Sequence, residues 1–101
     1  MPVTKVIRYT TKPGSSEENE RLVRGVFAEL SKEGGEGIRY AVFRLDDGVS
    51  FVHVAVLDGD ENPLSASPAF AEFQSGIPGR CVDGPIAADA AVIGSYRFLP
   101  E

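Results

Sequence analysis

A tight turn that leads into a strand with apolar residues on both sides limits the possible folds more than any other feature of the chain. Asp46-Asp47-Gly48 lies between the apolar runs 38–45 and 49–57. An Asp-Gly pair between two such runs is a strong signal for a β-hairpin. The predicted register contains these pairs: Asp46 with Val49, Arg44 with Phe51, Val42 with His53, and Tyr40 with Ala55.

This register predicts two faces for the hairpin, and both are apolar. One face carries Ala41, Phe43, Leu45, Val52, Val54 and Val56. The other carries Ile38, Tyr40, Val42, Phe51, Ala55 and Leu57, together with His53 and Arg44. A sheet with one face in water normally alternates apolar and polar residues. We therefore expect both faces of this sheet to be covered.

The N-terminal part of the chain predicts a strand followed by a helix. Residues 3–11 are rich in β-branched and aromatic side chains, and they end at the turn signal Lys12-Pro13-Gly14. Ser15 and Glu18 have the spacing of a capping box at the start of a helix. Glycines 34, 35 and 37 are expected to end this helix, and Gly25 is expected to allow close packing on the sheet.

The C-terminal part predicts a second helix and a last strand. Residues 58–62 are expected to form a loop, and Pro63 to open a turn. Ser67-Pro68 predicts the start of a helix with Phe70, Phe73 and Ile77 on its buried side, ended or kinked by Pro78-Gly79. Residues 82–85 are expected to form a loop, and residues 90–99 the last strand. The order βαββαβ predicts a single α+β domain over residues 1–101, ferredoxin-like, with a four-stranded antiparallel sheet and both helices on one face.

Two helices shelter only one face of such a sheet, so a homodimer is expected to shelter the other. Six to eight apolar side chains left in water would forgo on the order of 10 kcal/mol of burial, at ~1.5 kcal/mol each. Face-to-face pairing of two sheets is the simplest cover. The alternative is that β-branched residues are present only because they form strands well.

Composition excludes several classes of protein. The formal net charge is −5, and the ten Lys and Arg residues are scattered, so no nucleic-acid partner is expected. Arg21 and Arg24 are expected to pair with Glu17 and Glu20 in solvent. The longest apolar-looking run is far shorter than a membrane span, so no membrane partner is expected. The N-terminus lacks the apolar stretch of a signal peptide, and a cytoplasmic protein is expected.

His53 is the sole histidine and the candidate acid or base, although a hydrogen-bonded structural role is the alternative. Tyr40, Arg44 and Phe51 share its predicted face and are candidate ligand-binding residues. For Arg44, contact with solvent or a partner chain is the other possibility. Tyr9 and Tyr96 are expected to be packing residues. One histidine and one cysteine, Cys81, cannot form a zinc site alone, so no metal is expected. No cofactor is expected either.

Five segments carry a resemblance to a known family. They are Lys12-Pro13-Gly14, Gly37-Ile38-Arg39-Tyr40, Phe51-Val52-His53-Val54, Pro68-Ala69-Phe70 and Gly94-Ser95-Tyr96-Arg97-Phe98. With the order of elements, they resemble the antibiotic biosynthesis monooxygenase-like group of dimeric α+β barrel proteins. The resemblance implies a dimer with a substrate pocket between the helices and the sheet. Enzymes of the group use an asparagine, a tryptophan and a histidine; this chain has no tryptophan, and His53 matches in residue type only.

Two hypotheses about function follow. The first is a homodimer that binds a hydrophobic small molecule without catalysis. The alternative, implied by the resemblance, is a cofactor-independent monooxygenase that acts on an aromatic or polyketide-like substrate, with His53 as acid or base. The second hypothesis predicts an apolar pocket under the helices, lined by residues such as Phe27, Phe70 and Phe73.

Overall fold

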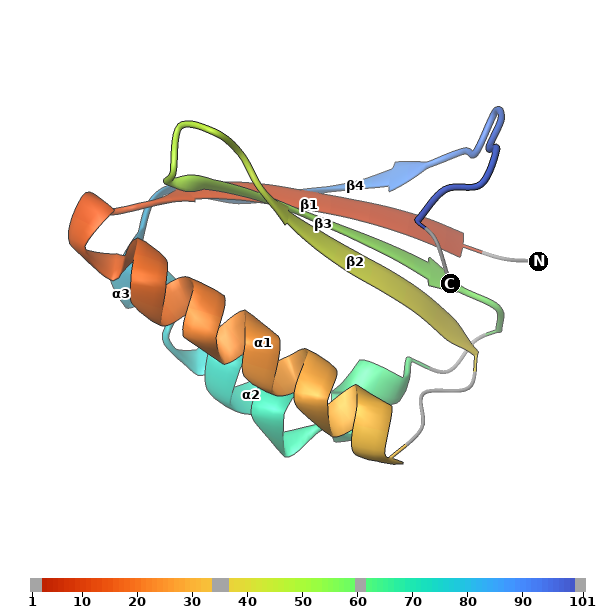
Figure 1. Cartoon of the computed structure of the whole chain (residues 1–101), viewed down its shortest axis with the longest axis horizontal. Helices are drawn as coiled ribbons and strands as arrows, with labels where there is room; N and C mark the ends of the chain where they lie inside the picture. The colour runs from red at the N-terminus through yellow and green to blue at the C-terminus, as the bar shows by residue number, and fades with distance from the viewer. Residues whose placement is uncertain (1–2, 34–36, 60–61, 100–101) are drawn as a thin grey trace.

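The chain folds into one four-stranded antiparallel sheet with its helices on one face (Figure 1). The structure is a computed structural model that describes residues 3–33, 37–59 and 62–99. In these residues the elements are β1 (Val3–Thr11), α1 (Ser16–Glu33), β2 (Ile38–Arg44), β3 (Ser50–Leu57), α2 (Pro68–Ser75), α3 (Ile77–Arg80) and β4 (Cys81–Ala90). Short 3₁₀ turns, η1 (Pro13–Ser15) and η2 (Pro63–Ala66), precede α1 and α2.

The sheet order is β2-β3-β1-β4, and the ferredoxin-like fold predicted from the sequence is confirmed. The predicted hairpin register is confirmed, because Arg44 pairs with Phe51, Val42 with His53 and Tyr40 with Ala55. Asp47 stabilises the turn by accepting hydrogen bonds from the backbone N–H groups of Val49 and Ser50. The hairpin therefore places Tyr40, Val42, Phe51 and His53 on one face.

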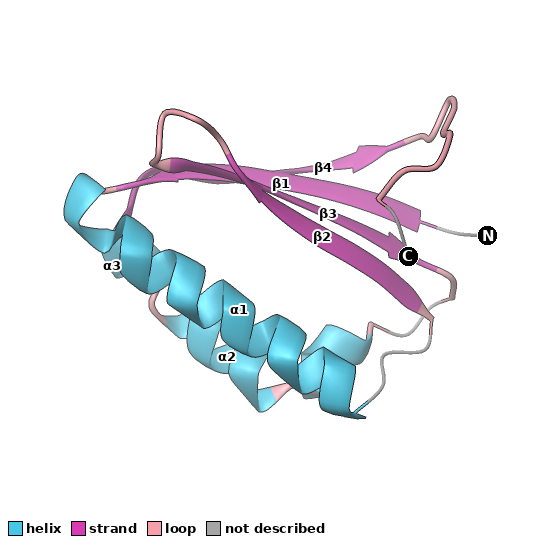
Figure 2. Cartoon of the chain, viewed as in Figure 1, coloured by secondary structure: helices cyan, strands magenta, loops and turns pink. Residues whose placement is uncertain are grey.

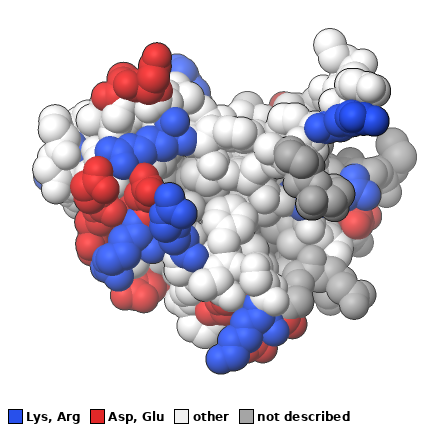
Figure 3. Space-filling view, viewed as in Figure 1, with Lys and Arg blue, Asp and Glu red and all other residues white. Residues whose placement is uncertain are grey.

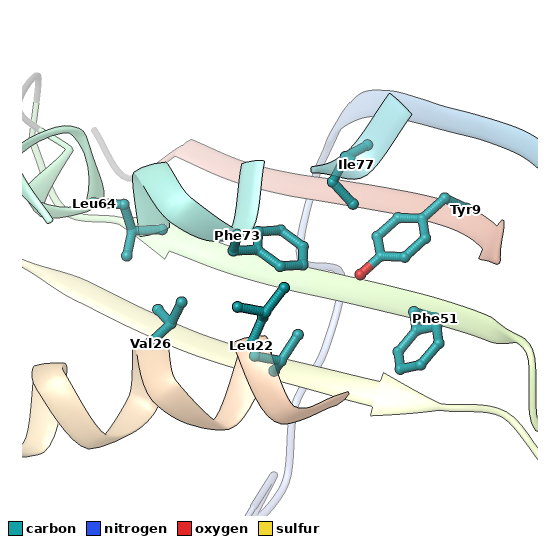
Figure 4. Packing of buried hydrophobic residues seen from close by; sticks show 8 residues of the cluster. Tyr9, Leu22, Val26, Phe51, Leu64, Phe73 and Ile77 are labelled. Atoms are coloured by element: carbon teal, nitrogen blue, oxygen red, sulfur yellow. The ribbon is translucent and has the colours of Figure 1, made fainter. Parts of the chain in front are cut away.

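The helices cover that same face as a single layer (Figure 2). Leu22, Val23 and Val26 recur at helical spacing on α1 and are buried against the sheet. The start of α2 is as predicted: the Ser67 hydroxyl accepts from the N–H of Phe70, and Pro68 fills the first helical position. The buried cluster joins Tyr9 and Phe51 of the sheet to residues of α1, η2, α2 and α3 (Figure 4).

The last strand is where the sequence prediction was wrong. It was expected over residues 90–99, but β4 comprises Cys81–Ala90 and includes the predicted loop 82–85. Gly84 and Pro85 are tolerated because β4 is an edge strand and its register with β1 shifts between Arg8 and Thr10. Gly84 has φ +82°, and a Cβ there would lie 2.9 Å from the carbonyl oxygen of Arg8.

Three local predictions about the helices also need correction. No hydrogen bond joins Ser15 to Glu18 in the described residues, because Ser15 lies in the 3₁₀ turn η1 and its N–H donates to the Lys12 carbonyl oxygen; the Glu18 carboxylate accepts from Arg21. Gly25 is exposed and does not contact the sheet; a Cβ there would meet no atom within 4 Å. The second helix breaks at Gly76 and resumes as α3, which contains Pro78 and Gly79. The predicted helix stop at glycines 34 and 35 and part of the loop 58–62 lie outside the described residues.

On the sheet face opposite the helices, the hairpin contributes mainly apolar residues, as predicted, although Arg8 of β1 and Arg39 of β2 lie on the same face. Val52, Val54 and Phe43 are half-buried there, and Phe98 from the C-terminal segment packs on Phe43 with ring centroids 6.3 Å apart. Exposed apolar side chains concentrate toward the C-terminus, where Ile86, Val92 and Ile93 are all more than half exposed. Among the described helices, none has both the length and the apolar character needed to cross a membrane.

Candidate functional site

A hydrogen-bonded chain of polar side chains crosses the core, and His53 lies at its centre. The His53 ring bonds through both nitrogens: Nε2 lies 2.7 Å from the Tyr9 hydroxyl, and Nδ1 lies 2.7 Å from the Tyr40 hydroxyl. These contacts follow from the register, since β3 lies between β1 and β2 and presents His53 between the two tyrosines. His53 is 4% exposed.

The series of hydrogen-bonded side chains continues from Tyr9 to the helices. Asn19 of α1 is fully buried and donates through Nδ2 to the Tyr9 hydroxyl at 2.9 Å. Arg80, at the end of α3, donates through Nε to Asn19 Oδ1 at 3.0 Å and through Nη2 to the Phe73 carbonyl oxygen at 2.7 Å. These five side chains, Arg80–Asn19–Tyr9–His53–Tyr40, form a buried polar chain.

Burial controls protonation in the buried polar chain. It lowers the pKa of His53 to about 4, because the charged imidazolium would lose its hydration. Burial also raises the pKa of Tyr9 to about 12, against a smaller opposing effect of the Asn19 hydrogen bond, and it raises the pKa of Tyr40. At neutral pH the histidine and both tyrosines are therefore uncharged. The site holds neutral hydrogen-bond donors and acceptors rather than an ionised base.

Arg80 is the charged end of the buried polar chain. It is 8% exposed, and no carboxylate forms an ion pair with it in the described residues. Its guanidinium stacks on the Phe73 ring at 5.3 Å from the centroid, a favourable cation–π geometry. The charge is thus accommodated by an aromatic ring, an amide oxygen and a backbone carbonyl.

A pocket of about 260 Å³ lies beside this chain, between α1 and the β2 side of the sheet. Its apolar walls are Val23, Phe27, Val42 and Phe51. Phe27 stacks on the Tyr40 ring with centroids 5.0 Å apart, so the pocket adjoins the end of the buried polar chain. The volume is slightly below the range of ~300–1,000 Å³ usual for ligand pockets, so a ligand would have to be compact.

Charged residues form the remaining wall of this pocket. Arg44 of β2 donates to Glu20 at 2.8 Å and to Glu17 at 3.1 Å, and Arg24 also bonds Glu20. The hydrogen bond from Arg44 is the largest cause of the lowered pKa of Glu20. Figure 3 shows this charged group over α1 and the hairpin, next to an uncharged surface. Arg44 therefore bridges the hairpin to α1, which differs from the possibility that it reaches solvent; its roles in ligand binding or contact with a partner chain stay predictions.

A second hollow, of about 120 Å³, lies on the opposite side of the sheet. Arg8, Val52 and Ile86 are among its lining residues, and none of the buried polar chain except Tyr9 contributes to it. It is less than half the volume of the pocket beside α1. We therefore take the pocket beside α1 as the candidate site.

The structure unites only some of the residues predicted for the site. Tyr40 and His53 are hydrogen-bonded, and Phe27, Arg44 and Phe51 line the adjoining pocket. Phe73 is buried and stacks on His53 with centroids 5.4 Å apart, while Phe70 packs on Phe73, so these two fill the core instead of lining the pocket. The roles in binding or catalysis assigned to these residues stay predictions.

Three residues of the buried polar chain were missed or misread in the sequence. Tyr9 was expected to be a packing residue, yet its hydroxyl points into the interior (Figure 4) and accepts from Asn19. A signal for Asn19 exists, because it precedes Leu22, Val23 and Val26 at helical spacing on the buried face of α1. Arg80 follows Phe73 and Ile77 at similar spacing. Helical periodicity predicts that such positions are buried. A polar residue at one of them is, however, equally consistent with a break in the apolar face.

No cluster of three or more metal-ligating side chains occurs in the described part of the chain. Cys81 is half-buried at the start of β4, and burial raises the pKa of its thiol despite the opposing effect of Arg80. A raised thiol pKa disfavours the nucleophilic thiolate at neutral pH. The chemistry available at the site is therefore hydrogen bonding by Tyr40, Tyr9 and His53 beside an apolar pocket.

Comparisons with known proteins identify the fold. No protein-family model and no curated protein matches the sequence. Among solved structures, SnoaB, a cofactor-independent oxygenase from Streptomyces nogalater, is 22% identical; the match covers 99% of this chain and 98% of that chain with a TM-score of 0.65. Rv0793 from Mycobacterium tuberculosis is 14% identical over 94% of this chain and 98% of that chain, with a TM-score of 0.75. An antibiotic biosynthesis monooxygenase is 14% identical over 91% of this chain and 99% of that chain, with a TM-score of 0.71. The chain therefore has the ferredoxin-like α+β fold of antibiotic biosynthesis monooxygenase-like proteins, as the resemblance implied.

Proposed function

We propose that this protein is a homodimer that binds a hydrophobic small molecule in the pocket between α1 and the sheet. The observation that carries the proposal is the pocket itself, which has apolar walls of Val23, Phe27, Val42 and Phe51 next to the buried polar chain. Apolar walls with a few converging polar groups are typical of small-molecule sites. The apolar sheet face opposite the helices supports the dimer, since a second copy is the simplest cover for it.

Filling the pocket should abolish binding. Val42→Phe adds a ring to its wall, whereas Val82→Phe adds the same atoms at an exposed position on β4. Tetralin, an apolar bicyclic hydrocarbon, is a suitable probe for NMR titration. We expect tetralin to shift the backbone amides of Val23, Phe27 and Val42 in the wild type and in Val82→Phe, but not in Val42→Phe. Equal shifts in both variants, or shifts confined to the opposite sheet face, would contradict this site.

A second candidate function is cofactor-independent oxygenation of an aromatic or polyketide-like substrate. It is favoured by the match to SnoaB, which spans nearly the whole of both chains. In such a reaction the substrate supplies the electrons: a methylene flanked by aromatic rings and one O₂ give a ketone and one water. Anthrone tests the idea, because its methylene has this character. Oxygen uptake that requires anthrone and is lost in Val42→Phe would support an oxygenase. Binding of anthrone without oxygen uptake would support the non-catalytic binding function instead.

A further inference from the structure

The buried polar chain has a direction, and Arg80 sets it. A guanidinium can only donate hydrogen bonds, so the atom of Asn19 that faces Arg80 must be its carbonyl oxygen. The amide nitrogen of Asn19 therefore faces Tyr9 and donates to it. Two links are fixed in this way, both with the donor on the Arg80 side.

The directions of the Tyr9–His53 and His53–Tyr40 hydrogen bonds depend on which tyrosine hydroxyl proton is left without an acceptor. If Tyr9 donates to His53 Nε2, then Nδ1 carries the histidine proton and donates to Tyr40. The unpaired hydroxyl proton is then on Tyr40, whose bond to His53 is only partly buried. In the reverse arrangement the unpaired proton is on Tyr9, where the bond is buried and the described residues offer no further acceptor. A buried donor without an acceptor costs about 1–3 kcal/mol, which favours the first arrangement.

We propose that every hydrogen bond in the buried polar chain is donated in the same direction, from Arg80 toward Tyr40. The Tyr40 hydroxyl is then free to donate to a ligand, and it selects ligands that carry a carbonyl or other acceptor oxygen. Asn19 and Arg80 are then positioning residues, because they act on the ligand only through Tyr9 and His53. Tyr40 does not itself line the pocket, but it neighbours two residues that do: Phe27 stacks on the Tyr40 ring, and Val42 follows Tyr40 on the same face of β2. The ligand class that follows is a compact, apolar molecule that carries an acceptor oxygen. This inference rests on the proposed binding function.

The direction can be measured without any ligand. His53 is the sole histidine, so the nitrogen chemical shifts of its ring report one residue. At about pH 7, well above its pKa, we expect a protonated Nδ1 and an unprotonated Nε2. Asn19→Asp presents an acceptor oxygen to both Arg80 and Tyr9, so the Tyr9 hydroxyl should donate to Asp instead of to His53. The bonds between Tyr9, His53 and Tyr40 should then reverse, and the ring proton of His53 should move to Nε2.

Asn62→Asp is the matched control for this measurement. Asn62 is exposed and its side chain already acts as an acceptor for a backbone N–H, so the His53 tautomer should not change. A protonated Nε2 in the wild type would overturn the proposal, even if Asn19→Asp fails to fold.

Ligand selection is tested with a matched pair of probes, tetralone and tetralin, which differ in one carbonyl oxygen. The wild type should bind tetralone roughly tenfold more tightly than tetralin, as expected for one added hydrogen bond. Tyr40→Phe should bind both equally, and Asn19→Asp should lose the preference. If neither probe binds, the proposed function fails while the tautomer result stands. If both bind with equal affinity in the wild type, the binding function holds and selection by Tyr40 is wrong.

Discussion

His53 shows how a residue with ordinary acid–base chemistry is changed by its surroundings. Its mid-strand position placed it on the face that the helices cover, and the two tyrosines occupy both of its ring nitrogens. With a pKa of about 4 it is neutral at physiological pH. A role as a hydrogen-bond relay therefore fits its environment better than a role as a general base, which works best with a pKa near the operating pH.

The lowered pKa predicts a specific pH dependence of stability. In the unfolded chain the histidine titrates near its ordinary pKa of ~6.5, so between that value and about 4 the unfolded state binds more protons than the folded state. Stability is then fully present above the unfolded pKa and falls as pH decreases toward the folded one. From about pH 7 to pH 5 this amounts to about 2 kcal/mol. His53→Gln should lack this portion of the decline in urea unfolding. An equal decline in both proteins would mean that His53 is not desolvated.

Arg80 is expected to matter for stability more than any exposed arginine. Arg80→Met removes the donor to Asn19 Oδ1 and to the Phe73 carbonyl, which stay buried. We expect a loss of about 2–4 kcal/mol in the free energy of unfolding, measured by urea denaturation. Arg21→Met is the matched control, because Arg21 is exposed and its only side-chain partner among the described residues is Glu18; its effect should lie within about 0.5 kcal/mol. Similar losses in the two variants would contradict a structural role for the buried polar chain.

Among the elements, α1 and β4 each contain a glycine, and the two are expected to respond in opposite ways to the same change. Gly84 in β4 has φ +82° and no room for a Cβ beside the backbone of Arg8, so Gly84→Ala should destabilise by about 1–3 kcal/mol. Gly25 lies in the exposed face of α1 with open space around it, so Gly25→Ala should stabilise by about 0.5–1 kcal/mol. Thermal unfolding of both variants measures the two effects. A stabilising Gly84→Ala would show that β4 is not paired with β1 in this register.

The elements also show where local sequence signals are reliable. The Asp-Gly turn and the Ser67-Pro68 cap act over two to four residues, and both predictions were confirmed. The last strand was misplaced because Gly84-Pro85 resembles a loop and residues 90–99 resemble a strand. Only the neighbouring β1, with its register shift at Arg8 and Thr10, shows that an edge strand accommodates both residues. Pairing with a distant segment decided the outcome, and local propensity did not.

For the whole molecule, the proposed dimer makes a measurable prediction. Light scattering at micromolar concentration should give twice the 10.8 kDa of one chain. Val54→Glu places a charge on the apolar sheet face opposite the helices and should give a folded monomer. Ala28→Glu is the control, because Ala28 is exposed on α1, and it should stay dimeric. A wild-type protein that stays monomeric would remove the argument that a second copy covers this face.

The order of elements, the hairpin register and the two apolar faces of the sheet could be read from the amino-acid order alone, since each depends on local turn chemistry or on side-chain period. Which polar residues meet in the core was settled only when the elements packed together. Arg80, Asn19 and Tyr9 come from three elements, Arg80 is 61 residues from Asn19, and no local pattern specifies that they touch. Their assembly depends on how α1 and α3 pack on the sheet, because a buried polar group must find its partner across elements, wherever packing places it.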